Sequence, residues 1–170
     1  MRKIIRGIFE NAFVYFIVRL ILKFNSKVSS FISHLKMRAL IKNVGRKSAC
    51  HWTVEIKYGE NISLGYHSSI GPYSCIGAMS PVTIGSYVRI SRGVVIESAG
   101  LDLNKPTPYP HISKPIVIED GVWIASNAVV LGGVTIGANS IIGAGAVVSK
   151  SVPANSIMVG QPLRNLKLKT

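Results

Sequence analysis

The stretch that decides the fold is VWIASNAVVLGGVTIGANSIIGAGAVV, residues 122–148. In it an aliphatic residue returns at every sixth position, at Ile124, Val130, Ile136, Ile142 and Val148. Small residues stand beside these positions, and small or β-branched residues stand four places further on. A six-residue period of this kind indicates a short strand followed by a sharp corner, with the aliphatic side chain pointing into a narrow core.

The same period extends back to Ile62. Twelve aliphatic residues follow it, namely Leu64, Ile70, Ile76, Ile84, Ile90, Ile96, Ile118, Ile124, Val130, Ile136, Ile142 and Val148. Three six-residue units close one triangular coil, and stacked coils form a solenoid. The sequence therefore predicts an all-β solenoid, a parallel β-helix of about four to five coils. Residues 54–63 are expected to form a less regular first coil that caps the bottom.

Two interruptions break the period. Met79-Ser80-Pro81 adds two residues and predicts a bulged corner. Residues 97–115 predict a loop that leaves the solenoid at a corner. Loops that leave a regular scaffold are the usual place for function, so this loop is a candidate for the site.

The composition limits the class of protein. The 170 residues suffice for one domain, and 48% are hydrophobic while only 16% are charged, which excludes a disordered chain. No uncharged apolar run approaches the roughly 20 residues of a membrane span, so a transmembrane bundle is excluded. The two cysteines, Cys50 and Cys75, form no CxxC motif, which favours a reduced, cytoplasmic protein over a disulfide framework.

Positive charge is concentrated at the N-terminus. The chain has a formal net charge of +13, and residues 1–50 hold eleven lysines and arginines beside one acid, Glu10. A helical stripe of Ile4, Ile8, Ala12, Phe16, Leu20 and Phe24 runs through this basic segment. It predicts an amphipathic helix that stops and restarts at Asn25–Ser26, and a second helix that continues to about Ile41.

The chain thus divides into a basic helical arm, residues 1–50, and a repeat domain, residues 51–170, with a C-terminal extension at 153–170. A basic amphipathic arm suits binding in the plane of an anionic membrane, here through residues 1–42, which would place the protein at the inner face of the plasma membrane. It also suits packing against its own domain or a neighbouring subunit. Nucleic acid is the least favoured partner of the three and is not expected.

The repeat closely resembles that of the hexapeptide-repeat acyltransferases. The likeness is sharpest in KPIVIEDGVWI, residues 114–124, and in GGVTIGANSIIGAGAVVSKSVPANSIMVGQP, residues 132–162, which look like the maltose and galactoside O-acetyltransferase branch and its polysaccharide-modifying relatives. The resemblance implies a left-handed parallel β-helix and a homotrimer with acyl-CoA between adjacent subunits. It further implies an acetyl-CoA-dependent O-acetyltransferase that acts on a sugar hydroxyl in cell-surface polysaccharide biosynthesis, without a metal.

The resemblance also implies which residues hold acetyl-CoA. The backbone at Ala125 and Gly143 would contact the pantetheine arm, and Trp123 would lie beside the acyl end. Lys150 and Arg164 match basic positions that often meet the CoA phosphates. The alternatives are that Ala125 and Gly143 are plain solenoid corners and that the two cations are solvated surface charges.

The residue that serves as catalytic base is where the sequence departs from the family. Relatives often carry a histidine in a GHD-type stretch of the loop, and Leu101 stands at that position here. His111 lies in the same loop and is the first candidate for the base, because an imidazole titrates near neutrality. His67 is the second candidate, and a surface role for both is the alternative. Asp102 could orient a base or an acceptor sugar, or could cap the loop turn.

Other functions remain open from the sequence. A degenerate β-helix that binds without catalysis is favoured by Leu101, and an N-acetyltransferase that acts on an amino sugar fits the same fold. A metal enzyme of the carbonic-anhydrase β-helix type needs three clustered histidines, whereas the four histidines here are widely separated. Acetyl-CoA turnover with thiol release separates an enzyme from a binding protein.

Overall fold

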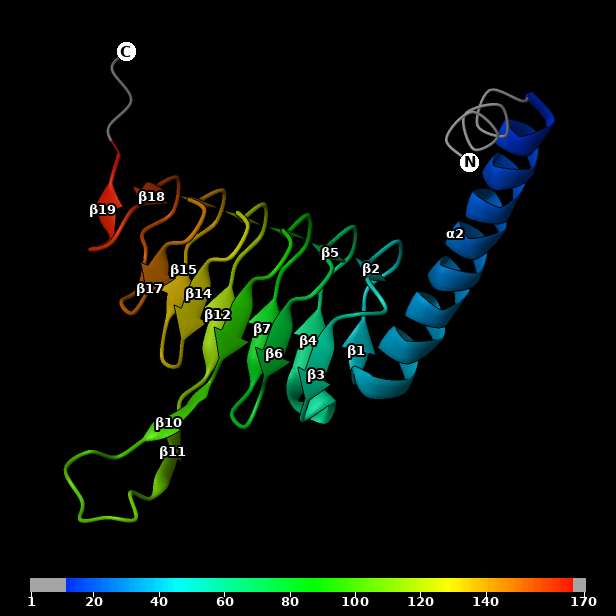
Figure 1. Ribbon diagram of the computed structural model, residues 1–170. Coiled ribbons are helices and arrows are strands. Elements are labelled where there is room, and N and C mark those ends of the chain that lie inside the picture. The colour runs from blue at the N-terminus through cyan, green and yellow to red at the C-terminus, as the bar shows by residue number, and fades with distance from the viewer. Residues whose placement is uncertain (1–11, 167–170) are drawn as a thin grey trace, which may run out of the picture.

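The computed structural model describes residues 12–166, which form a long helix followed by a parallel β-solenoid (Figure 1). Three sheets make up the solenoid. The first contains β1 (Asn43–Val44), β4 (Ile62–Leu64), β7 (Val82–Ile84), β12 (Ile116–Ile118) and β15 (Thr135–Ile136). The second contains β2 (Ala49–Cys50), β5 (Ser69–Ile70), β8 (Arg89–Ile90), β13 (Trp123–Ile124), β16 (Ile141–Ile142), β18 (Ile157–Val159) and the antiparallel β19 (Arg164–Asn165). The third contains β3 (Glu55–Lys57), β6 (Cys75–Gly77), β9 (Val95–Glu97), β14 (Val129–Leu131) and β17 (Val147–Val148).

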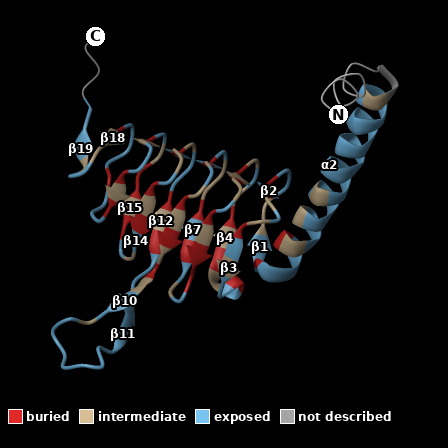
Figure 2. Ribbon diagram, in the orientation of Figure 1, coloured by how far each residue is buried: buried red, intermediate tan, exposed pale blue. Residues whose placement is uncertain are grey.

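The predicted aliphatic ladder is the core of the solenoid. All twelve residues are buried, and like residues pair in register from coil to coil. In the second sheet Ile70 pairs with Ile90, Ile90 with Ile124, and Ile124 with Ile142. In Figure 2 the buried residues lie along the strands of the coils, whereas the helix α2 and the loop beyond β10 and β11 are mostly exposed. The predicted period of six is therefore confirmed, because each side chain finds its equivalent one coil away.

Outside the two interruptions of the period, the residues four places after the ladder positions are buried as well. Where a serine stands there, its hydroxyl joins two coils. The Ser68 Oγ donates a hydrogen bond to the Gly85 carbonyl oxygen (2.7 Å) and accepts one from the Val88 N–H (3.0 Å). Ser74 and Ser140 make the same pair of bonds. These buried hydroxyls are thus fully used inside the protein.

At the corners of the coils, a positive φ recurs at a fixed position of the six-residue repeat. The residue three places after a ladder position has a positive φ at His67, Tyr73, Tyr87, Gly93, Gly121, Asn127, Gly133, Asn139 and Gly145. The glycines directly after the ladder positions serve the stacking of coils rather than the positive φ of the corner. A Cβ on Gly65 would overlap the carbonyl carbon of Gly85, so its small size permits the close stacking of coils.

The solenoid has about six turns, and the expected four to five were too few. The first coil begins at β1, within residues assigned to the arm, and has Val44, Cys50 and Ile56 at its ladder positions. The sequence placed the start of an irregular first coil at residue 54 and missed the part before it, because Cys50 is not aliphatic. In addition, the 3₁₀ helix η1 (Gly59–Asn61) lengthens the next interval to eight positions. At the other end, β18 adds a final strand.

The arm is a single helix, α2 (Ala12–Leu40). The predicted break at Asn25–Ser26 is wrong, because Ser26 does not cap a new helix. Its Oγ donates to the Lys23 carbonyl oxygen (2.8 Å) within the same turn, a bond that lets serine remain inside a helix. The predicted stripe positions Ile4 and Ile8 lie outside the described residues. In the portion from residue 12 to 166, no helix combines the length and apolarity that crossing a bilayer requires.

The predicted loop at 97–115 is a β-hairpin. Its strands, β10 (Ala99–Leu101) and β11 (His111–Ser113), pair antiparallel. The hairpin leaves the corner between the third and first sheets and projects from the side of the solenoid (Figure 1). It follows β9 and precedes β12, so the coils continue in register on both sides of it.

Candidate active site

The hairpin places His111 directly across from Leu101. The Asp102 N–H donates to the Pro110 carbonyl (3.0 Å), which makes the neighbouring pair a hydrogen-bonded one. Leu101 and His111 are therefore a non-hydrogen-bonded pair, in which Cα atoms lie about 4.5 Å apart and side chains share one face. Both side chains are exposed. The imidazole of His111 thus stands beside the position at which the resembling family carries its histidine.

The base of the hairpin is fixed to the preceding coil. Ser113, which lies on the His111 face, has its Oγ 2.7 Å from the Oγ of Ser80. The Ser80 N–H donates to the Ser98 Oγ (3.0 Å). The two interruptions of the repeat, at 79–81 and 97–115, therefore contact each other. As a result, the His111 face of the hairpin is turned towards the corner at 79–81.

A carboxylate supports the start of the hairpin. The Glu97 Oε1 accepts a hydrogen bond from the Ala99 N–H (3.0 Å). The carboxylate lies over Gly77, where any Cβ would collide with it. Gly77 therefore makes room for Glu97, and Glu97 holds the first residue of β10.

Asp102 caps the turn at the tip of the hairpin. Its Oδ1 accepts hydrogen bonds from the Asn104 backbone N–H (3.1 Å) and side-chain amide (3.2 Å). Because successive residues of a strand point to opposite faces, Asp102 lies on the other face from Leu101 and His111. The structure thus brings His111 and Leu101 together but does not place Asp102 beside the imidazole.

Trp123 lies on the outer surface of the second sheet. It pairs in register with Arg89 and Ile141, and 48% of its surface is exposed. Its indole Nε1–H donates to the Ser91 Oγ (3.1 Å) at the corner one coil before. This bond holds the ring at the edge of the corner between the second and third sheets.

The corner after Trp123 and the equivalent corner of the next coil contain the two residues that the resemblance places against the pantetheine arm, Ala125 and Gly143. The N–H groups of Ala125 and Gly143 are already used, because they donate to the Ile142 and Met158 carbonyls (2.8 and 2.7 Å). The next residues along the chain, Ser126 and Ala144, have N–H groups that donate to no partner within residues 12–166. Neither residue was predicted, although each lies in a corner of small residues, and this is a sequence signal that could have identified them.

The two predicted cations lie near the C-terminal end of the solenoid. Lys150 follows β17, and Arg164 lies in β19, opposite Val159. Both are exposed, and neither forms an ion pair within the part of the chain that the structure describes. They are accessible to an anionic group that enters from solvent.

The predicted site residues lie at two different corners. His111 belongs to the hairpin between the third and first sheets, whereas Trp123 and Ser126 flank the corner between the second and third sheets. A single chain therefore does not bring the imidazole to the indole. Any site that contains both needs a second copy of the chain.

His67 occupies the third corner, between the first and second sheets. Its ring stacks on Tyr87, with centroids 5.4 Å apart, and Tyr66 packs edge-on against both rings. His67 and Tyr87 also adopt the left-handed backbone conformation that bulky residues rarely take. His67 is therefore part of a packed aromatic corner, separate from both Trp123 and His111.

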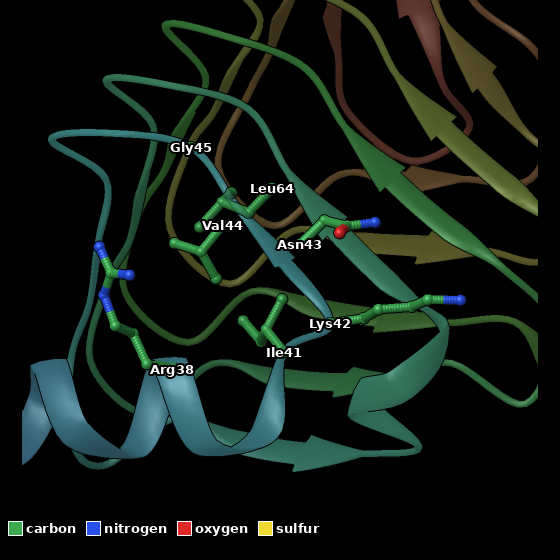
Figure 3. A pocket seen from close by; sticks show the side chains of 7 residues that line it. All are labelled: Arg38, Ile41, Lys42, Asn43, Val44, Gly45 and Leu64. Carbon is green, nitrogen blue, oxygen red and sulfur yellow. The ribbon is translucent and has the colours of Figure 1, made fainter.

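Two further observations limit the site. Among residues 12–166, no three histidine, cysteine or acidic side chains gather closely enough to hold a metal ion. A hollow of about 560 Å³ lies at the other end of the solenoid, between the end of α2 and the first coil (Figure 3). It is lined by Arg38, Ile41, Lys42, Asn43, Val44, Gly45 and Leu64. Because it is distant along the solenoid from β13, it is not part of this site.

Comparison with known sequences identifies relatives. The family model described as bacterial transferase hexapeptide (six repeats) matches residues 115–150. The chain is 34% identical to galactoside O-acetyltransferase of Escherichia coli K12, over 78% of this chain and 68% of that protein. It is 37% identical to a putative acetyltransferase of Schizosaccharomyces pombe over 65% of this chain, but it spans only 54% of that protein.

Solved structures show the same architecture. A hexapeptide-repeat acetyltransferase from Vibrio cholerae, complexed with acetyl coenzyme A, matches with a TM-score of 0.77 and 32% identity, over 93% of this chain and 90% of that one. A galactoside acetyltransferase in complex with coenzyme A matches with a TM-score of 0.73 and 33% identity, over 77% and 66% of the two chains.

Proposed function

Because the chain belongs to the hexapeptide-repeat acyltransferases and has their left-handed parallel β-helix, we propose that it transfers the acetyl group of acetyl-CoA to a sugar hydroxyl. Support comes from its similarity to an enzyme named galactoside O-acetyltransferase and to a structure that holds acetyl-CoA. The acceptor we favour is a cell-surface polysaccharide or its precursor, with the enzyme acting in the cytoplasm at the inner face of the plasma membrane. An amino sugar, acetylated on nitrogen, is the alternative acceptor.

The observation that carries the proposal is the cross-strand pair of Leu101 and His111. In the reaction, the acceptor oxygen attacks the thioester carbonyl while His111 takes the hydroxyl proton. The tetrahedral intermediate then collapses, the C–S bond breaks, and the CoA thiolate leaves and takes up a proton. His111 can do this from the neighbouring strand because its side chain emerges on the same face as that of Leu101.

Acetyl-CoA itself would lie along the corner after Trp123. The N–H groups of Ser126 and Ala144 are available to the amides of the pantetheine arm, in place of those of Ala125 and Gly143. Trp123 would flank the acyl end, and Lys150 and Arg164 would meet the CoA phosphates. We expect these contacts to set the affinity for acetyl-CoA, with the hairpin contributing little to it.

The proposal requires an oligomer. His111 and Trp123 lie at different corners of one chain, so the site is completed between subunits of a homotrimer. Light scattering should give three times the monomer mass. Mixing His111→Ala with Trp123→Ala chains during refolding should restore part of the activity, because some interfaces then combine an intact histidine with an intact tryptophan. A stable monomer that is fully active would overturn the shared site.

The test of the base uses thiol release from acetyl-CoA with a panel of sugar acceptors. His111→Ala should reduce kcat about 10²–10⁴-fold, the usual cost of losing a general base, with little change in acetyl-CoA affinity. His67→Ala is the matched control and should be almost silent. Adding Leu101→His to the His111→Ala variant should restore activity, because both positions share one face.

The outcomes separate the alternatives. Full activity in His111→Ala would show that the base lies elsewhere, and His67→Ala would then identify or exclude the second candidate. Acetyl-CoA binding without thiol release for any acceptor would favour a degenerate β-helix that only binds. Release with amino sugars alone would favour N-acetylation.

A further inference from the structure

The helix α2 contacts the solenoid only near its C-terminal end. Met37 is buried against the first coil, and Ile41, just after the helix, is buried with it. The Lys36 Nζ donates to the Trp52 and Val54 carbonyls (2.9 and 2.6 Å). Figures 1 and 2 show the rest of the helix projecting from the end of the solenoid with an exposed surface.

Between Phe24 and Lys36 the helix is oriented with its polar side inward. The partly buried residues of this stretch, Ser29, Ser33 and Lys36, lie on the side of Met37 that meets the solenoid. The opposite side is apolar. At positions spaced by four, three and four residues it carries Phe24, Val28, Phe31 and Leu35, which are 67%, 40%, 65% and 54% exposed. A helix that serves its own domain buries its apolar stripe, whereas α2 presents that stripe outward.

Cations border the apolar stripe. Arg19, Lys23 and Lys27 are four residues apart and therefore form one row along the helix. No aspartate or glutamate occurs between Ala12 and Leu40. Arg38 and Lys42 add positive charge where the helix meets the first coil (Figure 3). An apolar stripe with a cationic border and no acids is complementary to an anionic surface.

We propose that α2 docks in the plane of an anionic lipid membrane, with the side of Phe24, Val28, Phe31 and Leu35 in the interface and the row of Arg19, Lys23 and Lys27 against the headgroups. A second copy of the chain is a poorer occupant, because it would bring the same unbalanced positive charge against this one. The inference does not depend on the acetyltransferase activity, since it rests only on α2.

The test is flotation of the full-length protein with vesicles at low salt. Vesicles that contain phosphatidylglycerol should carry the protein, and pure phosphatidylcholine vesicles should carry much less. Phe24→Ser with Phe31→Ser should lower the bound fraction by roughly tenfold or more, because apolar burial in the interface is lost. Leu103→Ser is the matched control, since Leu103 is a large exposed apolar residue at the hairpin tip.

Charge is tested separately. Lys23→Glu with Lys27→Glu should reduce binding to anionic vesicles and flatten its dependence on salt. Equal binding to both kinds of vesicle, no binding to either, or equal loss in the Leu103→Ser control would overturn the proposal. A change of oligomeric state in the phenylalanine double variant would instead identify a second copy as the occupant. Circular dichroism checks that each variant keeps its helix.

Discussion

The solenoid and the helix α2 are built from similar apolar side chains but use them in opposite ways. In the solenoid, Ile124 is buried between Ile90 and Ile142, its equivalents in the neighbouring coils. On α2, Phe24 and Phe31 are among the most exposed large apolar residues of the described chain. A repeated strand supplies its own packing partner one coil away, whereas the apolar side of the projecting helix has none among residues 12–166. Hydrophobicity alone therefore does not reveal whether a side chain is core or interface.

The largest difference in stability between the two regions should appear when a ladder side chain is shortened to alanine. Ile124→Ala should lower the free energy of unfolding by about 2–5 kcal/mol, because it leaves a cavity in the middle of the stack. Phe31→Ala on α2 should change it by less than about 0.5 kcal/mol, the usual range for exposed sites. Urea denaturation of both variants checks this. Equal costs would mean that α2 packs as part of the core.

A smaller effect is expected from the buried hydroxyls. Ser68→Ala removes the group that satisfies the Gly85 carbonyl and the Val88 N–H, so stability should fall by about 1–3 kcal/mol. Ser149→Ala, at an exposed corner, is the control and should be neutral. Denaturation curves that show no loss for Ser68→Ala would mean that the coils are not joined through these side chains.

The smallest effect near neutral pH concerns the two thiols. Burial raises the pKa of Cys50, a ladder residue, to about 11, and burial also raises the pKa of Cys75 on the outer face. A thiol whose pKa is raised in the folded state stabilises the fold below its unfolded pKa of about 9, and that contribution is lost as pH rises towards 11.

We therefore expect the alkaline loss of stability between pH 9 and 11 to be reduced in Cys50→Val, which restores an aliphatic residue at the ladder position.

At pH 8 a thiol reagent should label Cys75 before Cys50, since only Cys50 is fully buried. Two results would show that the first coil opens easily and is less like core than the other coils. One is faster labelling of Cys50 than of Cys75, and the other is the same dependence of stability on pH in Cys50→Val as in the unaltered protein.

Prediction from the sequence succeeded where the six-residue units follow one another in the same order in every coil. The ladder from Leu64 to Val148 could be predicted because each residue meets its equivalent three repeat units further along the chain, which is 18 residues where nothing is inserted, as from Ile124 to Ile142. Prediction failed where the period was locally altered. Cys50 in place of an aliphatic residue and the inserted η1 hid the first coil, and Ser26 was taken as a helix cap although its hydroxyl bonds within the helix.

For the candidate site, the residue types were apparent from the sequence but their relations were not. The loop and His111 were marked from the residues, whereas the family resemblance implied Trp123 and, as backbone contacts, Ala125 and Gly143. The structure shows that the N–H groups of Ala125 and Gly143 donate hydrogen bonds between coils, whereas those of Ser126 and Ala144 do not. Which N–H group is free depends on the direction of each peptide at the corner, and the residue type does not specify that direction.

The sequence by itself determined the architecture of this protein, because a strict six-residue period leaves one way for aliphatic side chains to be buried together. Only the tertiary structure decided the register of the hairpin, which sets His111 across from Leu101, and the orientation of α2, which turns its apolar side away from the solenoid. The physical reason is that pairing across a turn and the docking of a helix depend on contacts between distant segments, and no local periodicity encodes such contacts.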